Sequence, residues 1–300
     1  MDKLFVIFNP AARGEKSRRV HRFLETKADS SITLTPTQRA GEAQSLAARA
    51  VTEGYKIIVA AGGDGTINEV INGIGTSGAA LGVLPLGTVN VFAHELRIPR
   101  KLDAAWAVIH DGHTRTIDLA RAQANGLTRY FVQLAGVGFD AHAVRTASWE
   151  LKKKIGPLSY VWAGIKALSR PHPPIEVSVN GSGPLGSGVA VLVGNGRFYG
   201  GPFALFPKAR MDDGLLDICV FETVGYWDVL RYGQGILRGV HLDLGDVKCF
   251  QTESLVCCAT GPTPFELDGE DAGDAPVTFS VVPRVLRVVV PKSNRGDEHA

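Results

Sequence analysis

The sequence predicts a two-domain protein of the α/β plus β class, with an N-terminal parallel-sheet α/β domain and a C-terminal β-sandwich-like domain. Apolar strand-like runs alternate with helical patterns through about residue 100, which is typical of a parallel sheet covered by helices. From residue 114 onward, short strand-like runs follow one another between glycine and proline turns, as in antiparallel sandwiches. The chain has 300 residues, of which 45% are hydrophobic and 21% are charged, a composition typical of a globular protein.

We place the first domain at 1–118, the second at 119–292 and a polar tail at 293–300, and the final strand at 285–291 can return to the first domain. The first domain is expected to contain strands at 4–8, 32–35, 55–61 and 81–84, with helices at 16–27, 42–52 and 103–110 and a further helix after each of two glycine turns. The second is expected to contain strands at 116–122, 129–134, 175–179, 189–193, 216–221, 247–251, 255–259, 277–282 and 285–290.

A glycine turn follows the strand at 55–61 and opens a helix. Its residues are Gly62, Gly63, Asp64, Gly65 and Thr66. Glycines tolerate positive φ and lack a Cβ, so backbone N–H groups can approach a phosphate at the positive end of the helix. The simpler reading is a turn in which Thr66 caps the helix and nothing binds. Asp64 favours Mg-nucleotide chemistry, because a carboxylate repels phosphate unless a cation lies between them.

A second turn of this kind follows the strand at 81–84. Gly87 and Thr88 place a glycine and a capping hydroxyl at the start of a helix, which offers another phosphate or ribose contact from a neighbouring strand end. Asn90 either contributes to that contact or braces the turns. Ligands of parallel sheets bind beyond the carboxyl ends of the strands, where both turns are expected to lie.

Two acidic loops in the second half could support phosphoryl transfer. Asp212-Asp213-Gly214 is either a turn in which Asp213 bonds its own backbone or a site for a hard cation. Asp268 and Glu270 flank one glycine. They form either an acidic hairpin turn or a pair in which one carboxylate accepts a proton and the other binds metal or supports its partner.

Charge and cysteine content exclude some classes of protein. A net charge of +2 gives no overall electrostatic argument for nucleic-acid binding, since nucleic-acid-binding proteins usually carry a concentrated basic surface. The four cysteines show no C-x-x-C spacing, so we expect reduced thiols in a cytosol, without a zinc site or disulfides. No apolar run is long enough to span a membrane. A basic amphipathic element at 149–168 either rests on an anionic bilayer or packs on the β domain, and we favour packing.

The run from Gly62 to Thr66, followed by Asn68-Glu69, resembles the nucleotide loop of the diacylglycerol kinase catalytic-domain superfamily, which includes sphingosine kinases and bacterial lipid kinases. NAD kinases share its Gly-Gly-Asp-Gly-Thr core. Further motifs in family order are Gly87-Thr88-x-Asn90, Gly136-Val137-Gly138-Phe139-Asp140-Ala141 and Asp268-Gly269-Glu270. The acidic residue that frequently follows the asparagine in the family is Val91 here.

The resemblance implies a set of site residues. The ATP-binding residues would be Asn9, Thr37, Gly62, Gly63, Asp64, Gly65, Thr66, Asn68, Glu69, Gly87, Thr88 and Asn90. Magnesium would be held by the side chain of Asp213 and the backbone carbonyls of Arg210 and Leu215. Glu270 is our choice for the proton acceptor, with Asp268 as the alternative.

The resemblance therefore implies an ATP-dependent lipid kinase that needs Mg²⁺ and transfers the γ-phosphoryl group to the hydroxyl of diacylglycerol, a sphingoid base or a related lipid. The alternatives are an NAD kinase and a nucleotide- or lipid-binding regulator without turnover. The expected partner is the lipid substrate, and nucleic acid is not expected. The sequence is compatible with a homodimer and with a cytoplasmic protein that contacts the inner membrane surface peripherally.

Overall fold

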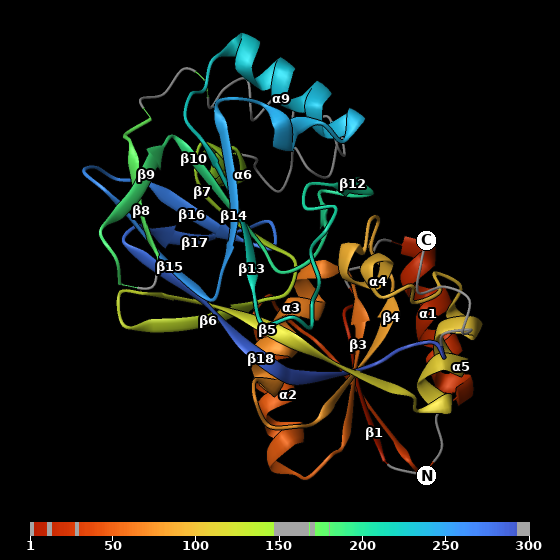
Figure 1. The fold of residues 1–300 in the computed structure, drawn as a ribbon. Helices are drawn as coiled ribbons and strands as arrows, with labels where there is room; N and C mark the ends of the chain where they lie inside the picture. Colours follow the sequence, from red (N-terminus) through yellow and green to blue (C-terminus); the bar gives the residue numbers. More distant parts are fainter. Residues whose placement is uncertain are drawn as a thin grey trace. The chain divides into compact units, whose positions relative to one another are not determined.

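The computed structural model describes residues 3–10, 14–27, 30–146, 168, 172–179 and 181–292. The chain divides into two compact units (Figure 1), one formed by Met1–Ile117 with Arg284–Ala300 and the other by Asp118–Pro283. The polar tail predicted at 293–300 lies outside the described residues, and so does the basic element predicted at 149–168, apart from Leu168.

A parallel sheet forms the centre of the first unit. Its strands β1 (Leu4–Phe8), β2 (Ile32–Pro36), β3 (Ile57–Gly62) and β4 (Ala80–Pro85) pair in the order β2-β1-β3-β4. The end of β18 (Val277–Val289) extends the sheet by pairing parallel to β4, with Arg287 opposite Ala80. Every residue of β1 and β4 is buried, as expected for strands covered on both faces.

Helices cover both faces of this sheet, as Figure 1 shows. They are α1 (Gly14–Lys27), α2 (Glu42–Thr52), α3 (Asp64–Ile74), α4 (Val91–Glu95) and α5 (Leu102–Asp111). Helices α2 and α3 lie together on one face. On the other face α1 meets α5, where the rings of Phe23 and Trp106 lie 6.0 Å apart. The predicted α/β domain is therefore confirmed.

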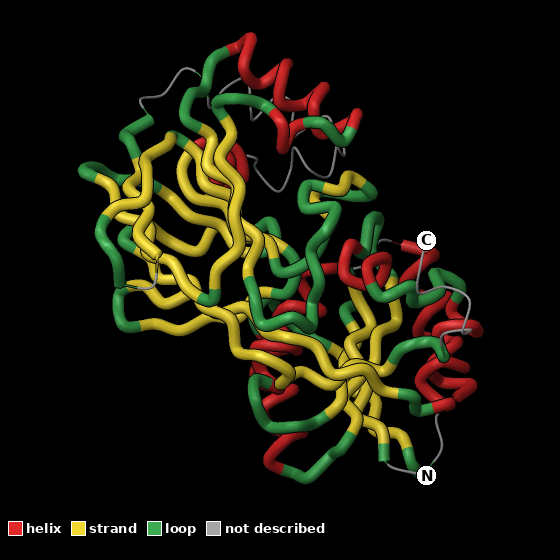
Figure 2. The backbone as a smooth tube through the Cα atoms, viewed as in Figure 1, coloured by secondary structure: helices red, strands yellow, loops and turns green. Residues whose placement is uncertain are grey.

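Strands predominate in the second unit (Figure 2), where they form two antiparallel layers. One layer is a six-stranded sheet with the order β14-β13-β10-β7-β16-β17. The other contains β6, β5, β18, β15, β8 and β9, which belong to the same ten-stranded sheet as β1 to β4. Their bounds are β5 (Thr114–Ala124), β6 (Leu127–Phe131), β7 (Leu134–Gly138), β8 (Ile175–Val179), β9 (Pro184–Gly188), β10 (Ala190–Gly194), β13 (Leu216–Phe221), β14 (Val247–Thr252), β15 (Ser254–Ala259), β16 (Pro264–Leu267) and β17 (Glu270–Asp274). The short strands β11 (Phe198–Tyr199) and β12 (Phe203–Ala204) form a separate pair.

The core of this unit lies between the two sheets. Val137, Val193 and Ile218 from the six-stranded sheet pack in one cluster with Ile175 and Phe279 from the other. This arrangement confirms the predicted sandwich-like domain. The outer face of the six-stranded sheet carries α6 (Phe139–Thr146), α9 (Tyr226–Arg238) and the turn η1 (His241–Asp243).

Two predicted strand boundaries are wrong. The strand predicted at 129–134 is divided between β6 and β7, because the chain turns at Val132-Gln133. The strands predicted at 277–282 and 285–290 are one strand, β18, which runs through Pro283. The two ends of β18 pair with different strands, β15 and β4, and Arg284 directly after Pro283 has a positive φ of 48°.

The cysteine prediction also needs correction, because Cys219 and Cys249 form a disulfide. The two residues are opposite each other in the β13–β14 ladder, with their Cα atoms 4.4 Å apart, a separation that permits the bond. They lie 30 residues apart in sequence, so only the strand register brings them together. Cys257 stays free, and burial raises the pKa of its thiol to about 12.

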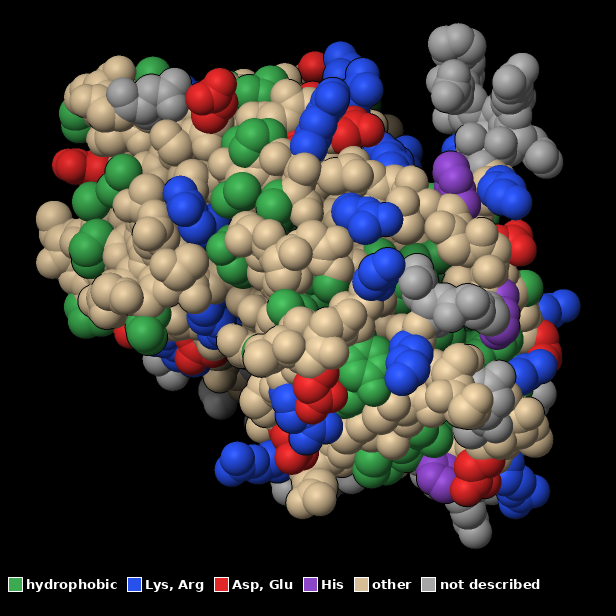
Figure 3. All heavy atoms as spheres, turned by 90° about the horizontal axis from the view of Figure 1, so that it is seen from below, with side chains coloured by type: hydrophobic (Ala, Val, Ile, Leu, Met, Phe, Trp, Pro, Cys, Tyr) green, Lys and Arg blue, Asp and Glu red, His purple; other side chains and the backbone are tan. Residues whose placement is uncertain are grey.

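Within the described residues, every helix is too short or too polar to cross a bilayer. The face drawn in Figure 3 carries lysine and arginine side chains alongside aspartate and glutamate.

Candidate active site

The glycine turn at the carboxyl end of β3 leads directly into α3. Gly63 is the N-cap of this helix, and the carbonyl of Gly63 accepts the first helical hydrogen bond from Ile67 N–H at 3.0 Å. The N–H groups in the first turn of a helix have no partner within it and therefore suit an anion. Asp64 lies in this turn, and its Oδ1 accepts a hydrogen bond from Phe92 N–H at 3.4 Å. The turn is thereby linked to the start of α4.

Close packing explains why the two turns need glycine. None of the glycines that we proposed for ATP binding has a positive φ, so that part of the sequence argument was wrong. A Cβ on Gly87 would lie 2.8 Å from the Cα of Gly63 and 2.9 Å from Asn90 Oδ1. The backbones of the two predicted turns therefore meet directly at the carboxyl edge of the sheet.

Asn90 builds the second turn from within. Its backbone is left-handed, with φ 54°, and its side chain is 1% exposed. Its Oδ1 accepts a hydrogen bond from Gly87 N–H at 3.2 Å, and its Nδ2 donates to the Gly87 carbonyl at 2.9 Å. Of the two roles that the sequence left open, these contacts assign Asn90 a bracing role within its own turn. Thr88 lies exposed beside it.

Asn9, Thr37 and Thr66 gather at the same edge. The backbone N–H of Asn9 donates to the carbonyl of Ala61 at 3.1 Å, which places Asn9 beside the end of β3. Its Nδ2 donates to Thr66 Oγ1 at 3.4 Å. The N–H of Thr37 donates to the Phe8 carbonyl at 2.9 Å, so Thr37 follows β2 next to the end of β1.

Glu69 contacts the start of a neighbouring helix, whereas Asn68 contacts its own helix. The two carboxylate oxygens of Glu69 accept hydrogen bonds from the N–H groups of Gly41 and Ala43, at 2.9 and 3.0 Å, where α2 begins. Asn68 is 7% exposed, and its Oδ1 accepts a hydrogen bond from Asn72 on the next turn of α3. The Glu69 contacts link α3 to the start of α2.

In the second unit, a buried aspartate organises the loop predicted to bind magnesium. Asp118 is fully buried, and its Oδ2 accepts a hydrogen bond from Gly214 N–H at 2.7 Å. Asp213 Oδ1 accepts one from Leu215 N–H at 3.1 Å, the local turn that the sequence allowed. Within the described residues there is no cluster of three or more His, Cys, Asp or Glu side chains that could hold a metal ion.

The charge around this loop suits a cation. The pKa of Asp217 on β13 is raised to about 6, mainly by burial and further by repulsion from Asp213, while a hydrogen bond from Gln251 opposes the shift. A divalent ion beside Asp213 would relieve that repulsion. The Arg210 side chain is mostly exposed, and its Nε lies 3.5 Å from Asp212 Oδ1. One carboxylate with neighbouring carbonyls is a ligand set that Mg²⁺ accepts.

Asp268 and Glu270 have different environments, although one glycine separates them. Asp268 Oδ1 accepts hydrogen bonds from the N–H groups of Gln133 and Leu134, at 2.9 and 3.0 Å, and Oδ2 accepts one from Val132 at 3.0 Å. Asp268 therefore anchors its turn to the connection between β6 and β7. Glu270 is about half exposed, and its Oε2 lies 3.7 Å from an Arg129 nitrogen.

A buried acidic pair lies directly behind this turn. Glu266 on β16 and Asp140 on α6 face each other over Gly136, where a Cβ would lie 2.4 Å from Asp140 Oδ2 and 3.1 Å from Glu266 Oε1. Burial, and then repulsion from Asp140, raises the pKa of Glu266 well above its ordinary value. Burial also raises the pKa of Asp140, while a hydrogen bond from the Tyr199 hydroxyl opposes this shift.

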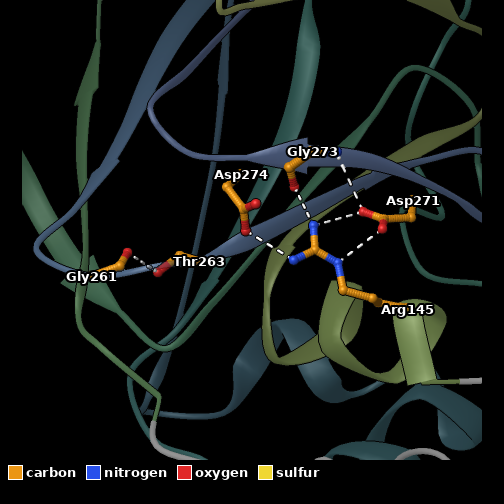
Figure 4. Close-up of polar contacts among 6 residues, drawn as sticks. All are labelled: Arg145, Gly261, Thr263, Asp271, Gly273 and Asp274. Atoms are coloured by element: carbon orange, nitrogen blue, oxygen red, sulfur yellow. Dashed lines mark hydrogen bonds and ion pairs between the residues drawn. The ribbon is translucent and has the colours of Figure 1, made fainter.

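The same pair fixes the position of the turn. Gly269 N–H donates to Glu266 Oε2 at 2.6 Å, so the glycine between Asp268 and Glu270 is bound to the buried carboxyl group. On the other side of the turn, Arg145 of α6 joins Asp271, Asp274 and the Gly273 carbonyl, as Figure 4 shows. Glu270 is thus a half-exposed carboxylate on a turn that is held from both sides.

No role was predicted from the sequence for Asp118, Asp140, Tyr199 or Glu266. Asp118 and Glu266 could have been identified from the sequence, because each lies within an apolar strand-like run. A charged side chain that is buried in such a run costs free energy unless it has a partner. Asp140 lies in a quoted motif, but nothing in the sequence indicated that it would meet Glu266. The first unit therefore provides a candidate phosphate site and the second a candidate cation loop with a rigid acidic turn.

Comparison with known proteins gives two family matches. Residues 3–122 match the diacylglycerol kinase catalytic domain, and residues 133–290 match the YegS C-terminal NAD kinase beta sandwich-like domain. A diacylglycerol kinase of Bacillus subtilis (strain 168) is 32% identical over 97% of both chains, and one of Staphylococcus carnosus is 28% identical over 98% of this chain and 96% of its own. A crystal structure of a diacylglycerol kinase from Bacillus anthracis shares the fold, with a TM-score of 0.76, 24% identity and 97% coverage of each chain.

Proposed function

The chain belongs to the family of bacterial diacylglycerol kinases and YegS-like lipid kinases, and we propose that it transfers the γ-phosphoryl group of ATP to a lipid hydroxyl. The observation that carries the proposal is the meeting of the Gly63 and Gly87 turns at the carboxyl edge of a parallel sheet, beside the start of α3. Such an edge suits a nucleotide phosphate.

We infer that diacylglycerol is the acceptor, because relatives that align over nearly the whole chain are named diacylglycerol kinases. In this proposal the N–H groups at the start of α3 and the Gly87 turn bind the phosphates of ATP. Asn9, Thr37 and Thr66 line the same edge and would contact the nucleotide.

Asp213 and the carbonyls of Arg210 and Leu215 would hold Mg²⁺ in the second unit. When bound, the ion would neutralise charge on the phosphates as the terminal phosphoryl group is transferred. Asp118 supports this loop from beneath through its hydrogen bond with Gly214.

We assign the proton acceptor to Glu270 and an anchoring role to Asp268. Both carboxylate oxygens of Asp268 already accept hydrogen bonds from backbone N–H groups. Loss of these hydrogen bonds would detach the turn at Asp268 from the connection between β6 and β7. Glu270 is half exposed, so its carboxylate can reach an acceptor hydroxyl.

The test is to incubate the purified protein with γ-labelled ATP, Mg²⁺, vesicles that contain diacylglycerol or a sphingoid base, and NAD. Labelled lipid is expected. Label in NAD alone would indicate an NAD kinase, and no label with retained nucleotide or lipid binding would indicate a regulator. Glu270→Gln is expected to abolish lipid labelling while ATP binding persists, and full turnover of that variant would exclude Glu270 as the proton acceptor.

A further inference from the structure

Helix α9 has one face packed on its unit and an apolar face in solvent. Tyr232 is buried on the inner side, where its ring lies 4.8 Å from that of Phe221 on β13. The outer side carries five large apolar side chains, which we call the α9 stripe. They are Tyr226 (63% exposed), Trp227 (83%), Leu230 (56%), Leu237 (69%) and, just beyond the helix, Val240 (46%).

The exposed apolar side chains of the stripe are clustered on one helix rather than scattered over the surface. Tyr226, Leu230 and Leu237 recur at intervals of four and seven residues, which places them on one side of a helix. Nine large hydrophobic side chains are exposed in the described part of the chain, and five of them belong to the stripe. Contiguous exposed apolar patches usually mark an interaction site.

The chemistry of the stripe fits the surface of a lipid bilayer. Tryptophan and tyrosine favour the boundary between headgroups and acyl chains, and leucine favours the acyl region. Arg238 lies at the end of the helix and forms no ion pair among the described residues, so its charge is available to anionic headgroups. Arg231, by contrast, is held by Asp228 and Asp246.

A protein partner fits less well. A stable protein interface involves about 20 to 30 residues on each side, whereas the stripe is one convex helix face with five apolar residues. A convex helix face needs no matching groove when it enters a fluid bilayer.

We propose that the α9 stripe docks the protein on an anionic lipid bilayer, with Trp227, Leu230 and Leu237 inserted at the boundary between headgroups and acyl chains. The inference rests on the proposed function, since a long-chain diacylglycerol acceptor resides in the bilayer. It adds the surface through which the enzyme reaches that substrate.

The test uses a triple variant, Trp227→Ser, Leu230→Ser and Leu237→Ser, and a control, Leu127→Ser with Leu185→Ser. The control removes exposed leucines from β6 and β9 of the same unit, which are 71% and 58% exposed. Binding is measured by sedimentation with vesicles of phosphatidylcholine, with and without phosphatidylglycerol. We expect the triple variant to lose affinity by at least about tenfold, or about 1.4 kcal/mol, and the control to bind like wild type.

A kinase assay separates docking from catalysis. With long-chain diacylglycerol in vesicles, the triple variant should show KM raised by about tenfold or more. With a short-chain diacylglycerol dissolved as monomer, kcat and KM should equal those of wild type. If wild type phosphorylates neither substrate, the proposed function fails. If wild type phosphorylates both and the triple variant matches it on vesicles, only the docking surface is wrong.

A second readout does not depend on the folding of the triple variant. Brominated lipid should quench the fluorescence of wild type more strongly than that of Trp227→Phe, because Trp227 would lie in the bilayer. Equal quenching would overturn the proposal. The proposal would also be overturned if the wild type is a dimer and the triple substitution converts it to a monomer without changing vesicle binding. The stripe would then be an interface with a second copy of the chain.

Discussion

Replacing Glu266 by glutamine should remove a pH dependence of folding stability. In the wild type, burial and Asp140 raise the pKa of Glu266, so the folded state holds the proton more tightly than the unfolded chain, where the pKa is about 4.3. The stability that this proton contributes is complete below that value and is lost as the pH rises through the folded-state pKa. Glutamine keeps an oxygen for Gly269 N–H, donates an N–H to Asp140 and cannot titrate.

The magnitude follows from proton linkage. One proton held only by the folded state changes the free energy of unfolding by about 1.4 kcal/mol per pH unit. Between the unfolded-state and folded-state pKa values of this group, the wild type should therefore lose up to about 1.4 kcal/mol per pH unit, a loss that Glu266→Gln lacks. Titrating groups remote from Glu266 and Asp140 cancel in the difference between the two proteins.

The assay is urea unfolding followed by circular dichroism at several pH values from 5 to 8. The free energy of unfolding of Glu266→Gln relative to wild type should increase with pH. The matched control is Glu253→Gln, the same chemical change at an exposed glutamate of the same unit, and its difference from wild type should stay flat. Parallel curves for wild type and Glu266→Gln would refute the reasoning that the buried pair holds a proton.

Three further predictions concern the turns. Gly87→Ala should cost about 1 to 3 kcal/mol of stability and raise the KM for ATP, because its methyl group would meet Gly63; unchanged thermal unfolding and KM would contradict the close approach. Asp268→Ala should destabilise the protein by about 3 kcal/mol or more, since three buried backbone N–H groups lose their acceptor; calorimetry with an unchanged Tm would show that the anchor is dispensable. Asp213→Asn should raise the Mg²⁺ concentration for half-maximal activity at least about tenfold, as measured by magnesium titration, whereas Asp212→Asn should not.

Several structural features could be derived from the sequence because their causes are local. The strands β8 and β13 have the predicted bounds, since runs rich in β-branched and other apolar residues mark them: β8 alternates apolar and polar residues, and β13 is mostly apolar. The strand, glycine turn and helix at β3 and α3 were also predictable, because glycine and periodicity act within a few residues. Helix α9 was not predicted, although apolar residues recur at helical spacing within it.

The sequence by itself determined the fold class and the two glycine turns, which depend on side-chain size, hydrophobic periodicity and backbone freedom over short stretches. The tertiary structure decided which distant residues meet: Cys219 with Cys249, Asp140 with Glu266, and Asp268 with the backbone at Val132 to Leu134. It also distinguished the anchored Asp268 from the half-exposed Glu270, which the sequence treated as near equals. The physical reason is that burial and hydrogen bonding depend on strand register and packing between residues 30 to more than a hundred positions apart, and no local pattern encodes them.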